Sequence, residues 1–402
     1  MPRISSTKKT PENVFKDPPS AAPSRLEAHS RPLLLAGLLI AWQKKAGRHD
    51  LPWQVRDPYR VWLSEIMLQQ TQVTTVIPYY LKFLERFPDL SALASANEES
   101  VLEAWSGLGY YSRARNLHRC AQDVMNVHGA VFPRTLEQLE TLPGIGRSTA
   151  AAIAVFCFSK KEAILDGNVK RVLSRVFAIA GIPTQSTTEK ELWQIALQQL
   201  PEQSIEPYTQ GLMDLGTSLC TPRKPQCSEC PLNSICVGFR HGLTHCLPTP
   251  KARKTTPLRE QSFALIIVQG QVLLERQASP GIWGGLLSFP KLDRLSAVSA
   301  SFGVPRLMPE PLPGFDHVFT HFKLRAKVVL YRLEDPAHGA IKTSIVSEPS
   351  IGEASISQAR VGEAEASEAA RYRLLSRDQI EHAALPQPIK TYLLNQAWSL
   401  LL

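Results

Sequence analysis

The sequence predicts a mainly α-helical N-terminal half followed by a smaller α+β domain. Three observations support this division. Residues 33–236 form one amphipathic helical pattern after another, whereas beyond residue 259 apolar and polar residues alternate as in β-strands. A stretch rich in proline, lysine and arginine at 243–259 separates the two patterns. At 402 residues, the chain is also longer than one average domain.

The composition is that of a globular chain. Hydrophobic residues make up 44% of it, and no apolar run reaches the roughly 18 residues that a membrane span needs. A net charge of +9 is compatible with a polyanionic partner. Residues 1–32 are polar, Pro/Ser-rich and without an apolar signal core. We therefore expect a disordered basic tail and a cytoplasmic protein, associated with the nucleoid if its source is bacterial.

A glycine turn between two helical patterns is the first candidate site. Gly144 and Gly146 flank Ile145, so the chain can reverse tightly before a helix that we expect to open at Arg147. Free amide groups at the start of that helix suit a phosphate oxygen of DNA. The alternative interpretation is an ordinary turn between two core helices.

Two carboxylates are candidates for acid–base chemistry. Asp166 precedes Gly167 and a helical run, the position that an N-cap occupies. Glu65 lies beside Trp62 on an apolar face of a helix expected at 60–73. Such surroundings hold a proton more tightly, as a general acid requires. The alternatives are a simple capping aspartate and a glutamate that reaches solvent or an ion-pair partner.

A Gly–Leu–Gly turn presents Tyr110 and Tyr111 immediately before a basic helix that includes Arg113. Aromatic side chains beside arginines suit a wedge between DNA bases, with the positive charges held on phosphates. Core tyrosines after a turn are the alternative.

Four cysteines give the strongest single signal. They are spaced C-x6-C-x2-C-x5-C over residues 220–236 and could surround one iron–sulfur cube or one zinc ion. Zinc sites more often contain two C-x2-C pairs, and this segment contains one. The candidate ligands are Cys220, Cys227, Cys230 and Cys236. The loop between the first two also carries Arg223 and Lys224.

The C-terminal part reads as strands. Residues 262–268 and 271–277 form a predicted hairpin around a Gln-Gly turn. Residues 321–333 alternate with the period of a half-buried strand. Residues 335–370, rich in Ala, Ser, Glu and Gly, predict a disordered insertion.

Eight ordered segments carry a resemblance to known proteins: LPWQ (51–54), VWLSEIMLQQTQV (61–73), GLGYYSRARNLH (107–118), LPGIGRSTA (142–150), ILDGNVKR (164–171), MDLG (213–216), GIWGGLLSFP (281–290) and HVFTHFKL (317–324). Together with the four cysteines they resemble the endonuclease III superfamily, and within it the adenine DNA glycosylase (MutY) family. The resemblance implies a helix-hairpin-helix DNA glycosylase fold with an iron–sulfur cluster loop at 33–242. It also implies a Nudix-like 8-oxoguanine-recognition domain at 260–402.

The resemblance implies an enzyme that flips adenine out of duplex DNA, opposite 8-oxoguanine or guanine, and hydrolyses its N-glycosidic bond. Glu65 would then protonate the adenine ring. Asp166 would stabilise the positive charge left on the sugar, and Asn168 would orient the sugar or the base.

Further roles carry over from the family by position. The adenine pocket would be lined by Trp53, Gln54 and Gln210. The DNA contacts would be made by Gln69, Gln70, Thr71, Tyr110 (the wedge), Arg113, Gly144, Gly146, Ser148, Arg223 and Lys224. The lesion would be read by Phe319, Thr320 and His321, where the family has Phe-Ser-His. The four cysteines would hold a [4Fe–4S] cluster, and the hairpin at 142–146 would hold a monovalent cation.

Two departures narrow the activity. Nudix hydrolases need an RE-x-x-EE helix for metal, but KLDRLSAVSASFG follows the GIWGGLLSFP segment, so we expect recognition without hydrolysis. Lyases of the superfamily carry a lysine where this chain has Ser148, so we expect base excision with little strand cleavage.

The alternatives are an endonuclease III-like glycosylase/lyase acting on oxidised pyrimidines and a non-enzymatic iron–sulfur DNA-binding regulator. A ferredoxin-like electron carrier would have tighter cysteine spacing and no DNA clamp. We expect a monomer that binds mismatched duplex DNA, works with downstream repair proteins and has no membrane partner.

Overall fold

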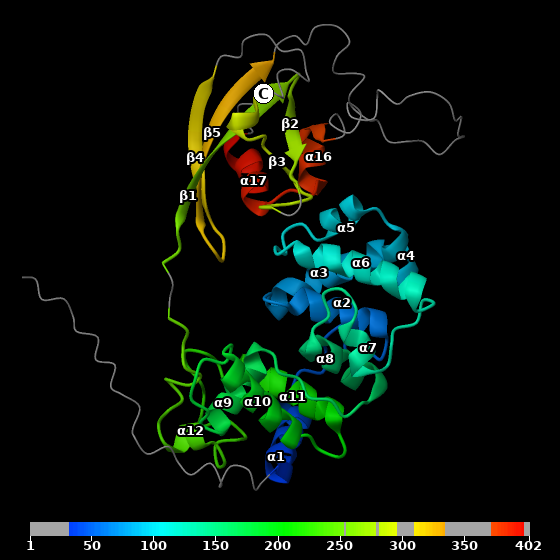
Figure 1. The fold of residues 1–402 in the computed structure, drawn as a ribbon, viewed down its shortest axis with the longest axis vertical. Coiled ribbons are helices and arrows are strands. Elements are labelled where there is room, and N and C mark those ends of the chain that lie inside the picture. Colours follow the sequence, from blue (N-terminus) through cyan, green and yellow to red (C-terminus); the bar gives the residue numbers. More distant parts are fainter. Residues whose placement is uncertain (1–31, 253–254, 279–280, 296–308, 334–370, 398–402) are drawn as a thin grey trace, which may run out of the picture. The chain divides into compact units, whose positions relative to one another are not determined.

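The computed structural model describes residues 32–252, 255–278, 281–295, 309–333 and 371–397 (Figure 1). The tail expected at 1–32, apart from its last residue, and the insertion expected at 335–370 lie outside these ranges. The chain divides into two compact units: residues 1–47 with 165–250, and residues 48–164 with 251–402. No helix within the described ranges combines the length and the apolar character that a membrane span requires.

The first unit is helical. Its elements are α1 (Pro32–Ala46), α9 (Gly167–Val176), α10 (Ser186–Gln198), α11 (Ile205–Ser218) and the short α12 (Val237–Arg240). Helix α11 packs against both α1 and α9, and α12 packs against α9. The buried side chains at these contacts include Leu39, Leu173 and Leu215. This packing fixes the start of α9, where Asp166 lies, beside the cysteine segment that leads into α12.

The second unit contains the remaining helices of the N-terminal half. They are α2 (Pro58–Leu68), α3 (Val73–Arg86), α4 (Leu90–Ser95), α5 (Glu98–Ala104), α6 (Ser112–Val127), α7 (Leu136–Glu140) and α8 (Arg147–Phe158). Trp62, Phe83 and Trp105 are fully buried in their common core. Burying a side chain of the size of Phe83 stabilises a fold by roughly 1.5–3 kcal/mol.

The helix expected at 60–73 is shorter than predicted. It ends at Leu68, and the next helix begins at Val73. The four residues between them form a turn in which Gln70 adopts a φ of 60°. The helical prediction was wrong here because residues 69–72 contain no glycine or proline to signal a stop, and the turn is held by Arg113, more than 40 residues away in sequence, which donates to the Gln69 carbonyl.

The C-terminal part of the second unit is built on one sheet. Its strands are β1 (Leu258–Val268), β2 (Gln271–Arg276), β3 (Leu287–Ser288), β4 (Glu310–Val318), β5 (Lys323–Leu333) and β6 (Tyr372–Leu375). The strand order is β3-β2-β1-β5-β4, with β6 paired to β2. β1 and β5 are parallel, whereas the other pairs are antiparallel.

Both strand predictions are confirmed. β1 and β2 form a hairpin in which Val268 pairs with Gln271. Gln269 and Gly270 make the turn with φ values of 48° and 75°, the left-handed angles that a tight hairpin needs. In β5, Leu324, Ala326, Val328 and Leu330 are buried on one face of the strand.

Two short helices cover one face of this sheet (Figure 1): α16 (Arg377–His382) and α17 (Gln387–Tyr392), which continues as the π-helical turn η3 (Leu393–Ala397). Their Ile380, Ile389 and Leu393 pack against the sheet in one core. A 3-10 turn, η2 (Leu292–Arg294), packs near the other face, where a smaller core surrounds Ile266 and Tyr331. The predicted α-helical half followed by an α+β domain is therefore confirmed.

Candidate active site

Asp166 is held by both oxygens of its carboxylate. It caps α9, with Oδ1 accepting a hydrogen bond from the Val169 amide at 2.8 Å. Its Oδ2 accepts a second bond from Asn168 Nδ2 at 3.1 Å. The predicted N-cap is thus confirmed. A helix N-terminus stabilises negative charge, so this position suits a carboxylate that acts while ionised.

Arg171 connects this turn to the cysteine loop. Its Nη2 donates to Asn168 Oδ1 at 2.9 Å and to the Gly216 carbonyl at 2.6 Å. Its Nε donates to the carbonyl of Cys220 at 2.8 Å. A continuous path of hydrogen bonds therefore runs from the carboxylate of Asp166, through Asn168 and Arg171, to the first cysteine of the loop.

Sequence reasoning assigned no role to Arg171, although it lies within the ILDGNVKR segment. The available signal was its position three residues after Asn168, which places both side chains on one face of α9. Burial lowers the pKa of Arg171, but the carbonyls around it replace the lost water. The structure thus adds a positioning residue to the predicted site.

Gly216 on α11 lies directly against the Asp166 turn. A Cβ atom at Gly216 would lie 2.6 Å from the Cβ of Asn168, closer than real Cβ atoms approach, and 3.2 Å from its Cα. Only glycine allows α11 to pack this closely, and the same residue offers its carbonyl to Arg171. This gives the MDLG segment a physical role.

The four predicted cysteine ligands share one pocket. None of the four is in a disulfide, and together with Arg175 and Leu232 they line one small cavity of about 20 Å³. Burial raises the pKa of Cys230 to about 12 and that of Cys236 to about 11. Thiolates at such positions need compensating positive charge, which a metal cluster supplies.

Arg175 holds one wall of this pocket. Its Nη1 lies 3.4 Å from the sulfur of Cys220 and donates to the Thr221 carbonyl at 2.8 Å. Its Nη2 donates to the carbonyl of Pro222 at 3.1 Å. Four soft thiolate donors around one enclosed space, with a guanidinium against the first of them, fit an iron–sulfur cluster. Arg223 and Lys224 are exposed on the same loop.

Glu65 lies on α2 in the second unit, between the fully buried Trp62 and the buried Ile66, and is itself partly exposed. Burial raises the pKa of the neighbouring Cys157 thiol to about 12, and the charges of Asp57 and Glu65 add to this rise. Glu65 therefore stands in partly apolar surroundings near α8. Its role as general acid remains a prediction.

Three segments predicted to contact DNA meet in one pocket of the second unit. The pocket has a volume of about 240 Å³ and is lined by Ile66, Gln69, Gln70, Tyr110, Ser112, Arg113, Asn116 and Gly144. Tyr110 is 47% exposed, and its φ of 48° is unusual for a bulky residue. Strained backbone of this kind persists where the surroundings over-determine it, often at functional sites. An exposed aromatic side chain held in this way suits a wedge.

Arg113 has a different role from the predicted one. It is only 8% exposed, and Nη1 of its guanidinium donates to the carbonyls of Ile66, Met67 and Gln69. Its Nη2 donates to the carbonyls of Leu108 and Gly109 and to the hydroxyl of Thr71. Burial lowers the pKa of Arg113 to about 10. The prediction of a phosphate contact is therefore corrected: Arg113 positions the Gln69–Thr71 turn and the Gly–Leu–Gly turn.

The glycine turn before α8 is confirmed in part. Helix α8 opens at Arg147 as predicted, with Gly146 as its N-cap. Gly144 adopts a φ of 79°, which requires glycine, but Gly146 has a φ of −92° and an added Cβ there would touch nothing within 4 Å. Only Gly144 is needed for the reversal. Ser148 lies in the first turn of α8.

The predicted adenine-pocket residues all contact other residues of the protein. Trp53 is buried and packs edge-on against Tyr80, with ring centroids 5.3 Å apart. Gln54 donates from Nε2 to the Arg48 carbonyl at 2.7 Å. In the first unit, Gln210 donates from Nε2 to Oδ1 of Asp214 at 2.8 Å. Their contacts with a base remain a prediction.

The predicted lesion-reading residues form the tip of the β4–β5 hairpin, where the amide of Phe319 donates to the Phe322 carbonyl at 2.9 Å. The Phe319 ring stacks on Phe322 at 4.6 Å and meets the edge of His317 at 4.5 Å. Thr320 and His321 are exposed. The tip thus presents two exposed polar side chains next to a cluster of aromatic rings.

Three family models match the chain. Residues 63–198 match the HhH-GPD superfamily of base excision DNA repair proteins, and residues 220–236 match the iron–sulfur binding domain of endonuclease III. Residues 262–395 match the NUDIX domain. The chain is therefore a DNA glycosylase of the base excision repair type, and its four-cysteine loop holds a [4Fe–4S] cluster.

The similar proteins identify the family. Adenine DNA glycosylase from Buchnera aphidicola subsp. Acyrthosiphon pisum is 37% identical over 304 residues, covering 75% of this chain and 87% of that protein. The human adenine DNA glycosylase is 34% identical over 366 residues, covering 74% of this chain and 67% of that protein. This chain belongs to the adenine DNA glycosylase family. A solved thermostable thymine-DNA glycosylase is 28% identical, with a TM-score of 0.49, over 52% of this chain and 97% of that one.

Replacing Asp166 by Asn should separate folding from catalysis. Asparagine caps helices about as well as aspartate, so the melting temperature should change little. Base release should fall on the order of 100- to 1000-fold, because the charge that stabilises the sugar cation is lost. Single-turnover base release and duplex binding are the measurements. Asp89→Asn, at the matching cap of α4, is the control and should release base at the wild-type rate. Equal rates in both variants would remove Asp166 from the chemistry.

Replacing Arg171 by Lys should weaken both ends of the hydrogen-bond path, because an ammonium cannot reach Asn168 and Cys220 together. We expect about a tenfold slower release of base per cluster-bearing molecule, the loss of one charged hydrogen bond. Base release is measured in single turnovers and normalised to iron content. Arg175→Lys touches the cysteine loop but not Asn168, so it should lose iron without this additional slowing. Unchanged normalised release in Arg171→Lys would show that the path does not support Asp166.

Proposed function

We propose that this chain removes adenine paired with 8-oxoguanine or guanine in duplex DNA by hydrolysing the N-glycosidic bond. The observation that carries the proposal is the Asp166 carboxylate, fixed through both oxygens at the start of α9. A carboxylate fixed in this way needs little reorganisation when positive charge develops on a sugar. Family membership supports adenine as the base that is released.

Two carboxyl groups divide the chemistry of the proposed reaction. Adenine leaves readily only after its ring is protonated, and Glu65 on α2 is the proton donor. As the bond between base and sugar breaks, Asp166 faces the positive charge of the deoxyribose until water attacks. Asn168 keeps Asp166 in place and is itself held by Arg171. The products are free adenine and an abasic site.

The pocket around Gln69, Gln70 and Tyr110 would open the duplex. A base inside the helix cannot be reached, so the enzyme extrudes it and fills the gap. Tyr110 is the exposed aromatic wedge, and Gln69 and Gln70 offer amide groups to the opposite strand. Gly144 brings the hairpin before α8 to the same pocket, where backbone groups suit a phosphate.

The enzyme would be monofunctional. A lyase needs an amine that forms a Schiff base with the sugar, and Ser148 offers only a hydroxyl at the position where lyases of the superfamily carry lysine. Borohydride should therefore trap little covalent complex. Trapping as efficient as that of a true lyase would favour the glycosylase/lyase alternative.

The β4–β5 hairpin tip is the proposed reader of 8-oxoguanine. Thr320 keeps a hydroxyl that can donate and accept hydrogen bonds. Burial lowers the pKa of the neighbouring His317, which favours the uncharged form of a ring that packs against Phe319 and Trp283. Since the GIWGGLLSFP segment is not followed by the metal-binding acidic helix of Nudix hydrolases, the domain would bind the lesion without hydrolysing nucleotides.

The test of this function is single-turnover adenine release from matched duplexes with adenine opposite 8-oxoguanine, guanine, cytosine or thymine. Release should be fastest opposite 8-oxoguanine, followed by guanine. Equal rates on all four duplexes would refute lesion-directed excision. Absence of adenine release, with retained DNA binding, would favour the iron–sulfur regulator.

Thr320→Ala should lower the preference for 8-oxoguanine over guanine by about five- to tenfold, the worth of one hydrogen bond, because the hydroxyl is lost. Release opposite guanine is the internal control and should not change. Truncation of the C-terminal part is a poorer test, since Leu286 and Ala384 are buried in the helical core of the second unit and their removal would expose it. An unchanged preference in Thr320→Ala would exclude this hydroxyl from lesion reading.

A further inference from the structure

The loop between β2 and β3, residues 281–286, is bound to the helices of the second unit. Leu286 is fully buried in the helical core. Trp283 packs against that core and also against the core of the sheet. This segment, which we call the β2–β3 loop, therefore contributes side chains to both the helical core and the core of the sheet.

Two guanidinium groups hold neighbouring carbonyls of the β2–β3 loop. Arg115 of α6 donates from Nη1 to the Gly284 carbonyl at 2.5 Å. Arg276 of β2 donates from Nη1 to the Gly285 carbonyl at 3.0 Å. One donor comes from a helix and the other from the sheet, so the loop is fixed with respect to both.

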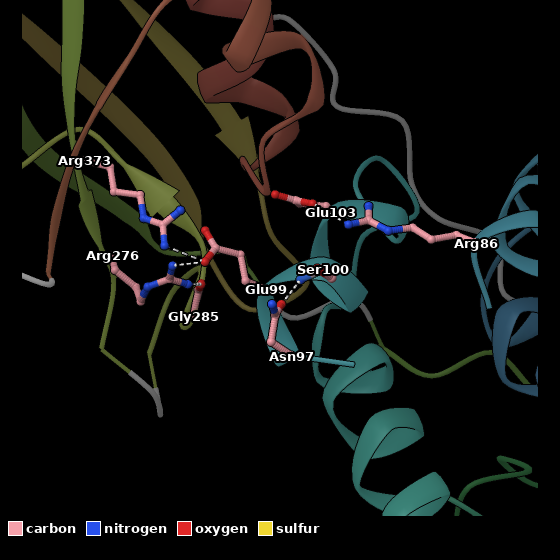
Figure 2. A network of polar contacts seen from close by, with 8 residues as sticks. All are labelled: Arg86, Asn97, Glu99, Ser100, Glu103, Arg276, Gly285 and Arg373. Carbon is pink, nitrogen blue, oxygen red and sulfur yellow. Dashed lines mark hydrogen bonds and ion pairs between the residues drawn. The ribbon is translucent and has the colours of Figure 1, made fainter. Parts of the chain in front are cut away.

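Glu99 joins the sheet arginines to α5 (Figure 2). Its Oε2 accepts from Nη2 of Arg276 at 2.8 Å and from Nη2 of Arg373, on the adjacent strand β6, also at 2.8 Å. Asn97 caps α5 by accepting from the Ser100 amide, which places Glu99 in the first turn, where the helix favours negative charge. Glu99 is 20% exposed, so solvent screens these pairs only in part.

Gly285 shows how closely the loop approaches the helices. Its φ is 80°, and an added Cβ would lie 3.3 Å from Leu102, 3.4 Å from Glu98 and 3.5 Å from Arg115. A Cβ here would touch three side chains of α5 and α6, and its backbone angle would strain any residue other than glycine. The loop is thus held against the helices by close packing as well as by hydrogen bonds from charged side chains.

The β2–β3 loop reaches the proposed lesion reader through Trp283. This residue has a φ of 59°, and its ring centroid lies 5.7 Å from that of Phe319 and 6.4 Å from that of His317. On the helix side, Arg115 lies one turn into α6, which begins at Ser112, directly after Tyr110 and Tyr111. A continuous set of contacts therefore joins the segment around the proposed wedge, Tyr110, to the hairpin tip.

We propose that Glu99 is a positioning residue for lesion preference. Through Arg276 and the β2–β3 loop it fixes the aromatic rings at the β4–β5 hairpin tip relative to α6, the helix that follows Tyr110. The inference rests on the proposed function, because it assigns to Glu99 the coupling of lesion reading to adenine release. Glu99 itself touches neither base nor sugar.

The test is Glu99→Gln, which keeps the shape of the side chain and removes its charge. The preference for adenine opposite 8-oxoguanine over adenine opposite guanine should fall about tenfold, since the acceptor of two ion pairs loses its charge and the arginines are left with a neutral amide oxygen. Release opposite guanine and the melting temperature should stay at the wild-type values. Both substrates are measured in single turnovers with the full-length, cluster-bearing enzyme.

Glu103→Gln is the matched control. Glu103 lies one turn further along α5 and pairs with Arg86 at 2.9 Å, so its ion pair stays within the helices (Figure 2). It should keep the wild-type preference.

Three results would overturn the inference: unchanged preference in Glu99→Gln, an equal slowing on both substrates, or an equal loss in Glu103→Gln. Each of these presupposes that the wild-type enzyme prefers 8-oxoguanine. A wild-type enzyme without that preference would overturn the proposed function itself, and the inference with it. The wild-type measurement therefore separates the two failures.

Discussion

The partly buried fork of Arg171 is the interaction on which the Asp166 turn and the cysteine loop both depend. One guanidinium bonds to Asn168, Gly216 and Cys220 at once. Even a partly buried guanidinium loses stability when its acceptors are removed, so these partners stabilise one another. The turn that carries Asp166 and the loop that carries the cluster ligands are therefore fixed by the same side chain. Loss of order in the cysteine loop would reach Asp166 through Arg171 and Asn168.

The sequence predicted features that depend on local patterns. The Asp166 cap, the start of α8 and the alternation of β5 follow from a few neighbouring residues, and the structure has all three. It did not predict the roles of Arg113 and Arg171. Residue type shows charge but not burial, and five of the six acceptors of Arg113 are carbonyls, which every residue carries. The Gln69–Gln72 turn was missed for a related reason: Arg113, more than 40 residues away, holds it.

The basic composition also takes on a second meaning. A net charge of +9 suggested a surface for a polyanion, but several of the arginines point inward. Arg113, Arg171 and Arg175 are bonded mainly to backbone carbonyls. The guanidinium is suited to this because it presents five donors in a rigid plane and stays charged when buried. Net charge therefore overstates the positive charge at the surface, to which the exposed Arg223 and Lys224 on the cluster loop contribute.

Strained backbone and arginine side chains occur together at three turns of the second unit. Gln70, Tyr110 and Trp283 all have positive φ, which costs a non-glycine residue about 1–3 kcal/mol unless its surroundings enforce it. The residue next to each, Gln69, Gly109 or Gly284, offers its carbonyl to Arg113 or Arg115. These arginines lie two residues apart on α6, in the turn that follows Tyr110. One helical turn thus holds the proposed opposite-strand probe, the proposed wedge and the β2–β3 loop. In the proposed reaction, lesion reading and base extrusion are then coupled through one fixed set of contacts.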